Sequence, residues 1–269
     1  MEALTGLIQQ VERESLQHPL SPPVLIACLD LTQLGSNDNE ESIQRLSEKA
    51  YLHQVAAVCV QPPLVACAKK TLQRLFNNSS LQGLASAVQV ATVINFPAGT
   101  HAIKDVLVAI TYALEQGAEE FDIVIPYQAY LASGDIRLIK NFILSCKKLL
   151  PKQCIKVILE SGDERYSDKT LIDAALASLE AGAQFLKTST GKITHGACLH
   201  DAATLLYAIQ KFGDETRGFK ASGGVRTHLQ AAQYYLLAQK IMGEAWPNKN
   251  TFRLGASSLL DDLIANMPS

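Results

Sequence analysis

The chain has 269 residues, and 48% of them are apolar, which is enough to bury one large core. An α/β barrel typically needs about 250 residues, and two smaller domains of roughly 130 residues each are the alternative that this length allows. Lys and Arg number 24 against 26 Asp and Glu, a net charge of −2 with no long run of one sign. This balance favours neither nucleic acid nor an anionic membrane as a partner.

The N-terminal residues and the cysteines indicate the compartment. Residues 1–17 are amphipathic and carry acidic residues, without the basic and continuous apolar regions of a signal peptide. No apolar stretch approaches the ~18 residues needed to span a bilayer. The six cysteines are scattered, and most lie inside apolar runs, which is typical of buried, reduced thiols. We therefore expect a soluble cytoplasmic protein without a disulfide framework.

Short apolar runs rich in β-branched residues recur about every 30 to 35 residues, the length of one strand–helix unit. Their apolar character is nearly continuous, as in a parallel strand covered on both faces. The runs are 24–32, 55–62, 88–96, 119–127, 155–161, 184–190, 217–223 and 252–258. Segments with helical periodicity lie between them, among them 39–51, 101–116, 135–149, 168–181, 198–212 and 227–240.

Eight strand–helix units with no linker and no shift in composition predict a single (β/α)₈ barrel, a TIM barrel, that occupies the whole chain. A doubly wound open sheet is the alternative fold. The barrel proper is expected over residues 24–265, and residues 1–20 are expected to form an extra N-terminal helix that closes the bottom of the barrel. Residues 242–250 are expected to form a longer loop before the eighth strand.

Charged residues interrupt these runs close to the carboxyl ends of the strands, where barrel enzymes place their active sites. A buried charge without a partner costs several kcal/mol, so several together indicate a functional site. The charged positions are Asp30, Asp122, Lys156, Glu160, Lys187 and Lys220. Three lysines are therefore expected to face three carboxylates near one end of the barrel.

Two of these lysines suit covalent chemistry. Lys187 and Lys220 lie on consecutive strands, and adjacent parallel strands are about 4.8 Å apart. Desolvation and a second cation both disfavour an ammonium group, which lowers the pKa of a lysine and makes its amine a nucleophile. Asp122 can then act as a proton acceptor or orient a water molecule. The pattern predicts a Schiff-base lysine.

Three glycine-containing turns follow the last three strands, at 189–192, 221–226 and 254–260. Glycines let the backbone approach an anion, and Lys192 and Arg226 add positive charge. Ser257 or Ser258 is expected to cap a short helix whose N-terminus favours phosphate. The sequence thus predicts a phosphate site beside the lysines. No arrangement of metal ligands is recognisable, and Cys59 reads as a packed thiol that is able to face the site.

Eight sequence blocks, one per expected strand, resemble the deoxyribose-phosphate aldolase family of class I aldolases. The resemblance runs from about Ala27 to Leu263. Its blocks are LDLT (29–32), VCVQP (58–62), NFPAG (95–99), FDIVIPY (121–127), KVILESG (156–162), FLKTSTGK (185–192), FKASGGVR (219–226) and FRLGASSLL (252–260).

The resemblance implies a barrel enzyme that reversibly cleaves 2-deoxy-D-ribose 5-phosphate to D-glyceraldehyde 3-phosphate and acetaldehyde, in the catabolism of deoxyribonucleosides. It needs neither a metal nor another cofactor. Lys187 matches the Schiff-base lysine, Lys220 the lysine that perturbs it, and Asp122 the proton-relay carboxylate. Asp30, Lys156 and Cys59 match supporting positions. The phosphate-binding positions are Gly191, Lys192, Gly223, Gly224, Arg226, Gly255, Ser257 and Ser258.

Some members of the family carry a C-terminal tyrosine that assists proton transfer, but this chain has no tyrosine after Tyr235. Asp122 and water are therefore expected to suffice. The alternative enzymes are another Schiff-base barrel aldolase or a transaldolase acting on a longer phosphorylated sugar, and a decarboxylase-type barrel that forms no imine. A sugar-phosphate binding protein without catalysis is the alternative outside enzymes. The resemblance suggests a monomer or a homodimer.

Overall fold

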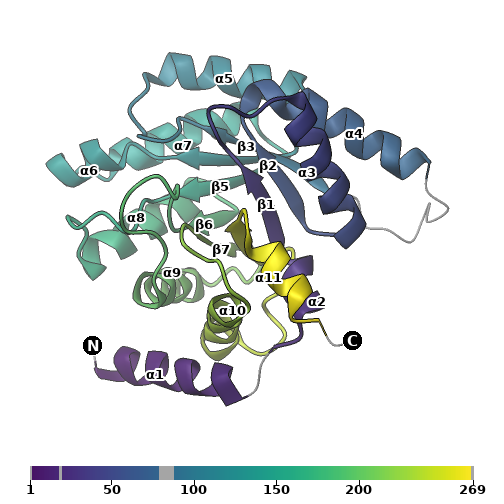
Figure 1. Ribbon diagram of the computed structural model, residues 1–269. Coiled ribbons are helices and arrows are strands. Elements are labelled where there is room, and N and C mark those ends of the chain that lie inside the picture. Colours follow the sequence, from purple (N-terminus) through teal and green to yellow (C-terminus); the bar gives the residue numbers. More distant parts are fainter. Residues whose placement is uncertain (1, 18–19, 79–87, 268–269) are drawn as a thin grey trace.

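The computed structural model describes residues 2–17, 20–78 and 88–267. Its eight strands are parallel and form a closed barrel in chain order, with β8 paired to β1 (Figure 1). The strands are Leu29–Gln33 (β1), Ala57–Val60 (β2), Gln89–Ile94 (β3), Glu120–Val124 (β4), Cys154–Ile158 (β5), Phe185–Lys187 (β6), Gly218–Ser222 (β7) and Phe252–Ala256 (β8). The predicted (β/α)₈ barrel is confirmed, and the open-sheet alternative is wrong.

Helices follow the strands and surround the barrel (Figure 1). They are α1 (Glu2–Gln17), α2 (Pro22–Ala27), α3 (Glu40–His53), α4 (Val65–Asn77), α5 (Ile103–Glu115), α6 (Tyr127–Ser133), α7 (Arg137–Leu149), α8 (Asp168–Glu180), α9 (Leu199–Phe212), α10 (His228–Met242) and α11 (Leu259–Ala265). A short 3₁₀ helix, η1 (Pro62–Leu64), precedes α4. Three of the helices begin at capping boxes, with N-caps at Asn39, Ser167 and Thr227.

Successive side chains of a strand point to opposite faces. In each strand of the barrel, alternate residues therefore face the outer helices and the barrel interior. On β2, Val58 and Val60 join the large core under the helices, whereas Ala57 and Cys59 belong to a small cluster with Ala91 and Val93 of β3. The large core is continuous around the barrel and is built mainly from aliphatic side chains. The inward-facing positions on the remaining strands are therefore available for polar residues.

The first predicted strand was wrong at its start. Residues 22–27 form α2, and β1 begins only at Leu29. Pro22 and Pro23 explain the difference, because proline is favoured in the first turn of a helix, where its missing N–H would have no partner. The apolar residues that follow are compatible with either structure, and Leu25 and Ile26 are buried from the helix.

The N-terminal helix exists, but it does not close the bottom of the barrel as expected. Helix α1 packs against the outer helices α9 and α10 (Figure 1). The segment that leads into the N-terminal end of β1 is α2, which packs against α10 and α11. None of the helices in the described ranges is long and apolar enough to cross a bilayer.

The loop expected at 242–250 lies between the end of α10 at Met242 and the start of β8 at Phe252. It is anchored to the barrel by side chains: Trp246 donates its indole N–H to the carbonyl oxygen of Glu215, and the Tyr235 hydroxyl donates to the carbonyl oxygen of Pro247. This loop therefore holds the N-terminal end of β8 in a fixed place.

Candidate active site

The three predicted lysines lie inside the barrel on neighbouring strands. Lys156 is on β5, Lys187 ends β6, and Lys220 is on β7, where its Cα is paired with that of Lys187. Lys156 and Lys220 are fully buried, and the Lys187 side chain keeps 2% of its exposure. Of these three side chains, that of Lys187 thus keeps residual exposure to solvent.

Asp122 of β4 bonds all three lysines. Its Oδ2 accepts hydrogen bonds from the Nζ atoms of Lys187 and Lys220, both at 2.7 Å. Its Oδ1 accepts from the Nζ of Lys156 at 3.1 Å. A single buried carboxylate is therefore shared by three ammonium groups, and it sets their positions relative to one another.

Asp30 of β1 and two residues that sequence reasoning did not single out complete the cluster. Asp30 accepts from the Nζ of Lys220 at 2.5 Å and from the Nη1 of Arg253 at 2.6 Å. Glu120 accepts from the Nζ of Lys156 at 2.5 Å and from the Nη2 of Arg253 at 2.9 Å. Glu120 had a signal in the sequence, because it is two positions before Asp122 and alternate residues of a strand share a face.

Glu160, by contrast, does not join the lysines as expected. It lies beyond the end of β5, where its φ of 55° turns the backbone. Its Oε1 accepts from the backbone N–H of Thr190 at 3.1 Å, and its Oε2 accepts from the Thr190 hydroxyl at 2.6 Å. Burial raises the pKa of Glu160, and the two bonds from Thr190 oppose that rise. Glu160 therefore fixes the turn that carries Gly191 and Lys192.

The charge of the cluster bears on which lysine loses its proton. Four cations and three carboxylates are bonded into one network, so the network has no net charge when one lysine is neutral. Burial lowers the pKa of Lys187; Asp122 opposes this effect, and Lys220 adds to it. This is the direction that a nucleophilic amine needs.

The pKa values of the two neighbouring lysines, Lys220 and Lys156, shift in the opposite direction. Burial also disfavours the ammonium of Lys220, but Asp122 and Asp30 outweigh it and raise the pKa of Lys220. For Lys156, burial is outweighed by the same two carboxylates and Glu120, and the pKa rises well above its ordinary value. Burial would raise the pKa of Asp122, but the three lysines hold it well below the usual range. Lys187 is therefore the amine of the cluster most readily deprotonated.

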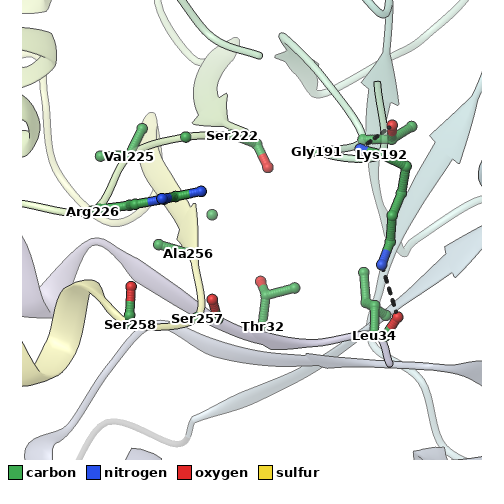
Figure 2. Close-up of a pocket in the computed structure, with 14 residues that line it drawn as sticks. Thr32, Leu34, Gly191, Lys192, Ser222, Val225, Arg226, Ala256, Ser257 and Ser258 are labelled. Carbon is green, nitrogen blue, oxygen red and sulfur yellow. Dashed lines mark hydrogen bonds between the residues drawn. The ribbon is translucent and has the colours of Figure 1, made fainter. Parts of the chain in front are cut away.

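A cavity of about 230 Å³ opens above the lysines, and all eight predicted phosphate residues line it (Figure 2). Figure 2 shows the side chains of Arg226 and Lys192 on opposite sides of this cavity. The Nζ of Lys192 donates to the carbonyl oxygen of Leu34 at 3.2 Å. Ser258 occupies the N-cap position of α11, but neither its side chain nor that of Ser257 makes a capping hydrogen bond, contrary to expectation.

Two glycines determine the shape of this cavity. A Cβ on Gly255 would lie 2.8 Å from the Ser222 Oγ and 2.9 Å from the Lys220 Cε, so the cavity floor rests directly on the lysine cluster. Gly223 has a φ of 88°, and a Cβ on it would lie 3.2 Å from the Cα of Gly191. The turns after β6 and β7 are therefore held against each other, and only glycine fits between them.

On β2 and β3, the side of the barrel interior away from the lysines is apolar. Cys59, Ala91 and Val93 form it, with Leu34 and Phe96 packed against them. Burial raises the pKa of the Cys59 thiol to about 11, so it is protonated near neutral pH. The expectation of a packed thiol fits this environment. Within the described ranges, no group of three or more His, Cys, Asp and Glu side chains is placed to hold a metal ion.

A closed parallel barrel with a charged cluster in its interior and a cavity at the carboxyl ends of its strands is the architecture of a (β/α)₈-barrel enzyme. Comparison with known proteins makes the class more specific. Residues 24–262 match the DeoC/LacD family of aldolases, and the chain belongs to that family. It is therefore a carbon–carbon lyase, as the sequence resemblance implied.

Solved structures agree with this assignment. A protein from Coccidioides immitis, described as a deoxyribose-phosphate aldolase, is 26% identical, with a TM-score of 0.76 over 97% of this chain and 96% of the other. The tetrameric deoxyribose phosphate aldolase of Aeropyrum pernix is also 26% identical, with a TM-score of 0.74 over 96% and 97% of the two chains. A protein from Toxoplasma gondii is 20% identical over 94% of each chain, with a TM-score of 0.76, and supports the fold alone.

Proposed function

We propose that this enzyme is a class I aldolase that reversibly cleaves 2-deoxy-D-ribose 5-phosphate to D-glyceraldehyde 3-phosphate and acetaldehyde. The observation that carries the proposal is the position of Lys187, which is buried, is surrounded by charged partners and lies next to a cavity suited to phosphate. The two similar proteins described as deoxyribose-phosphate aldolases, each 26% identical to this chain, favour the same substrate.

Lys187 is the proposed nucleophile. As the free amine, it attacks the aldehyde carbon of the open-chain sugar, and loss of water gives a protonated imine. Lys220 and Lys156 stay protonated because their carboxylate partners raise their pKa values. The charge of Lys220 therefore disfavours a further ammonium group at Lys187, and this assists formation of the free amine.

Asp122 is the proposed proton acceptor for the bond-breaking step. The hydroxyl group at C3 of the sugar gives up its proton, the bond between C2 and C3 breaks, and the electron pair moves to the imine to form an enamine. Glyceraldehyde 3-phosphate leaves. Protonation of the enamine at C2 and addition of water then release acetaldehyde and restore the Lys187 amine. Before this step Asp122 is ionised, because three lysines lower its pKa, so it can accept the proton of the C3 hydroxyl.

The three glycine turns are proposed to hold the phosphate. Their backbone N–H groups, the hydroxyls of Ser257 and Ser258, and the cations Lys192 and Arg226 all border one cavity. Backbone donors and guanidinium or ammonium groups are the usual partners of a phosphate dianion. Binding at this end would place the sugar chain toward Gly255 and the lysines beneath it.

The test is cleavage of deoxyribose 5-phosphate by the purified enzyme, with acetaldehyde measured as a product. Fructose 1,6-bisphosphate, offered in parallel, separates this function from that of an aldolase for longer phosphorylated sugars. We expect turnover of the first substrate and none of the second. Turnover of the second substrate alone would contradict the proposal.

We further propose that the whole chain acts as one barrel domain in the cytoplasm and takes part in breakdown of deoxyribose phosphates. A monomer or a homodimer also remains a prediction. Light scattering of the purified protein tests it, and a mass of four chains would contradict it.

A further inference from the structure

We infer that Glu120 and Arg253, at the far end of the barrel from the substrate cavity, are positioning residues that set the pH at which Lys187 becomes a nucleophile. The inference rests on the proposed role of Lys187. It begins from the bonding of the two residues. Both are buried and joined through two hydrogen bonds, and each also holds one member of the lysine cluster.

Their location separates them from the substrate. A second cavity, of about 450 Å³, opens at the N-terminal end of the strands, and Glu120 and Arg253 line it together with Gln54, Gln89 and Lys249. Among the residues that the structure describes, none lines both this cavity and the cavity bordered by the glycine turns. Replacing either residue therefore changes charge near Lys187 without altering a group proposed to touch the substrate.

The pair reaches Lys187 through two short routes. Glu120 accepts from the Nζ of Lys156, which in turn donates to Asp122, the partner of Lys187. Arg253 donates to Asp30, which accepts from Lys220, and Lys220 also donates to Asp122. The guanidinium of Arg253 also lies 5.7 Å from the ring centroid of Phe185, two residues before Lys187 on the same face of β6. The pair is thus fixed in place by ionic bonds and by ring contact.

Apart from β6, which carries Lys187 itself, every strand but β3 contributes a titratable group to the surroundings of Lys187, and β3 presents Ala91 and Val93 instead. The thiol of Cys59 is protonated near neutral pH because burial raises its pKa. Glu160 is bonded to Thr190 and not to the lysines. The charged groups in the bonded network are Asp30, Glu120, Asp122, Lys156, Lys220 and Arg253.

The number of charges in the network predicts that replacing Glu120 and replacing Arg253 shift the titration of Lys187 in opposite directions. With Lys187 protonated, the network holds four cations and three anions. Glu120→Gln removes an anion, so the ammonium of Lys187 becomes less favourable and its titration moves to lower pH. Arg253→Gln removes a cation, so the titration moves to higher pH. For charges separated by about 10 Å in an interior of effective dielectric constant about 20, each shift is about one pH unit.

The experiment measures the rate of imine formation between acetaldehyde and the full-length enzyme as a function of pH, with the adduct on Lys187 trapped by borohydride. We expect the pH at the midpoint of this rate profile to be lower in Glu120→Gln and higher in Arg253→Gln than in the wild type. In the double variant it returns to the wild-type value, because one cation and one anion are lost together. Arg253→Lys keeps the charge and is expected to keep the wild-type midpoint.

A purely structural role would lower the rate at every pH without moving the midpoints apart. The inference is overturned if the midpoints of Glu120→Gln and Arg253→Gln equal that of the wild type, or if both move in the same direction. The double variant also guards against misfolding, since replacing both partners of a buried ion pair is tolerated better than leaving one charge unpaired. Failure of the proposed function is distinct, because the wild-type enzyme itself would then give no adduct on Lys187.

Discussion

The cavity at the mouth of the barrel is lined by glycine turns, hydroxyl groups and two cations, Lys192 and Arg226, that reach solvent. Deeper in the barrel, strands β1 and β4 to β8 carry seven charged side chains that are bonded to one another and shielded from water. At the mouth, each charge is screened and acts almost alone. In the interior, each charge sets the protonation of its neighbours, so one substitution affects the whole group.

The largest expected effect is at Lys187. Lys187→Met keeps the length and apolar stem of the side chain but removes the amine, so neither imine nor product should form. We expect turnover to fall by at least about 10³-fold. Lys169→Met, which removes an exposed lysine of α8, is the matched control and should keep full activity. Appreciable cleavage by Lys187→Met would show that another group carries the chemistry.

Asp122→Asn separates imine formation from bond cleavage. The amide cannot accept the proton, so cleavage should fall by about 10²- to 10⁴-fold. Loss of the shared anion lowers the pKa of Lys187 further, so the imine with acetaldehyde should still form, and at lower pH than in the wild type. Three ammonium groups lose their common partner, and the free energy of unfolding should fall by about 3–5 kcal/mol. Borohydride trapping and denaturant unfolding measure the two effects, and unimpaired cleavage would contradict the role of Asp122.

Lys220→Met tests the effect of a neighbouring cation. Lys220 helps lower the pKa of Lys187, so its removal should raise that pKa and move the acid limb of the pH–rate profile upward by about one unit. At a pH below the midpoint, about tenfold less free amine should be present. The profile of kcat/KM against pH measures this shift, and an unmoved acid limb would argue against the assigned role.

Gly255→Ala tests the boundary between the two regions. The new Cβ would lie 2.8 Å from the Ser222 Oγ and 2.9 Å from the Lys220 Cε, so both side chains must move. We expect kcat to fall about tenfold or more, because small displacements of catalytic groups are costly. Adding Ser222→Gly removes one of the two contacts and should restore part of the activity. A single variant with wild-type kcat would show that the floor of the cavity can adapt.

The smallest effects are expected at the mouth. Lys192→Met and Arg226→Met should each raise KM for deoxyribose 5-phosphate about tenfold, with less effect at high salt. Neither should alter turnover of unphosphorylated 2-deoxyribose, which is the internal control. A parallel loss with both substrates would mean that these cations act on the chemistry and not on the phosphate.

The sequence predicted the barrel because its strands are covered on both faces and stand out as apolar runs. It also predicted that Lys187 and Lys220 are neighbours, since consecutive strands of a barrel pair. Arg253 is harder to find, because only the register of β8 against β7 shows that it lies level with Lys220. Glu160 was placed wrongly for a similar reason: it follows the end of β5, where the alternation of faces no longer holds.

Helix α2 shows a different limit of prediction from the sequence. The apolar residues after Pro23 fit a buried strand as well as a short helix, and periodicity cannot separate the two over so few positions. The proline pair at the start of α2 is the local signal for a helix. The position of α1 could not be predicted at all from its own residues, because an amphipathic helix can pack on any apolar surface that the barrel leaves open.

The most direct test of Lys187 as the Schiff-base lysine is to incubate the enzyme with acetaldehyde, reduce it with borohydride, and map the modified peptide by mass spectrometry. We expect one ethyl group on Lys187, absent without aldehyde and absent when Lys187 is replaced by Met. A folded enzyme that gives no adduct, or an adduct on Lys220 or Lys156 instead, would contradict it.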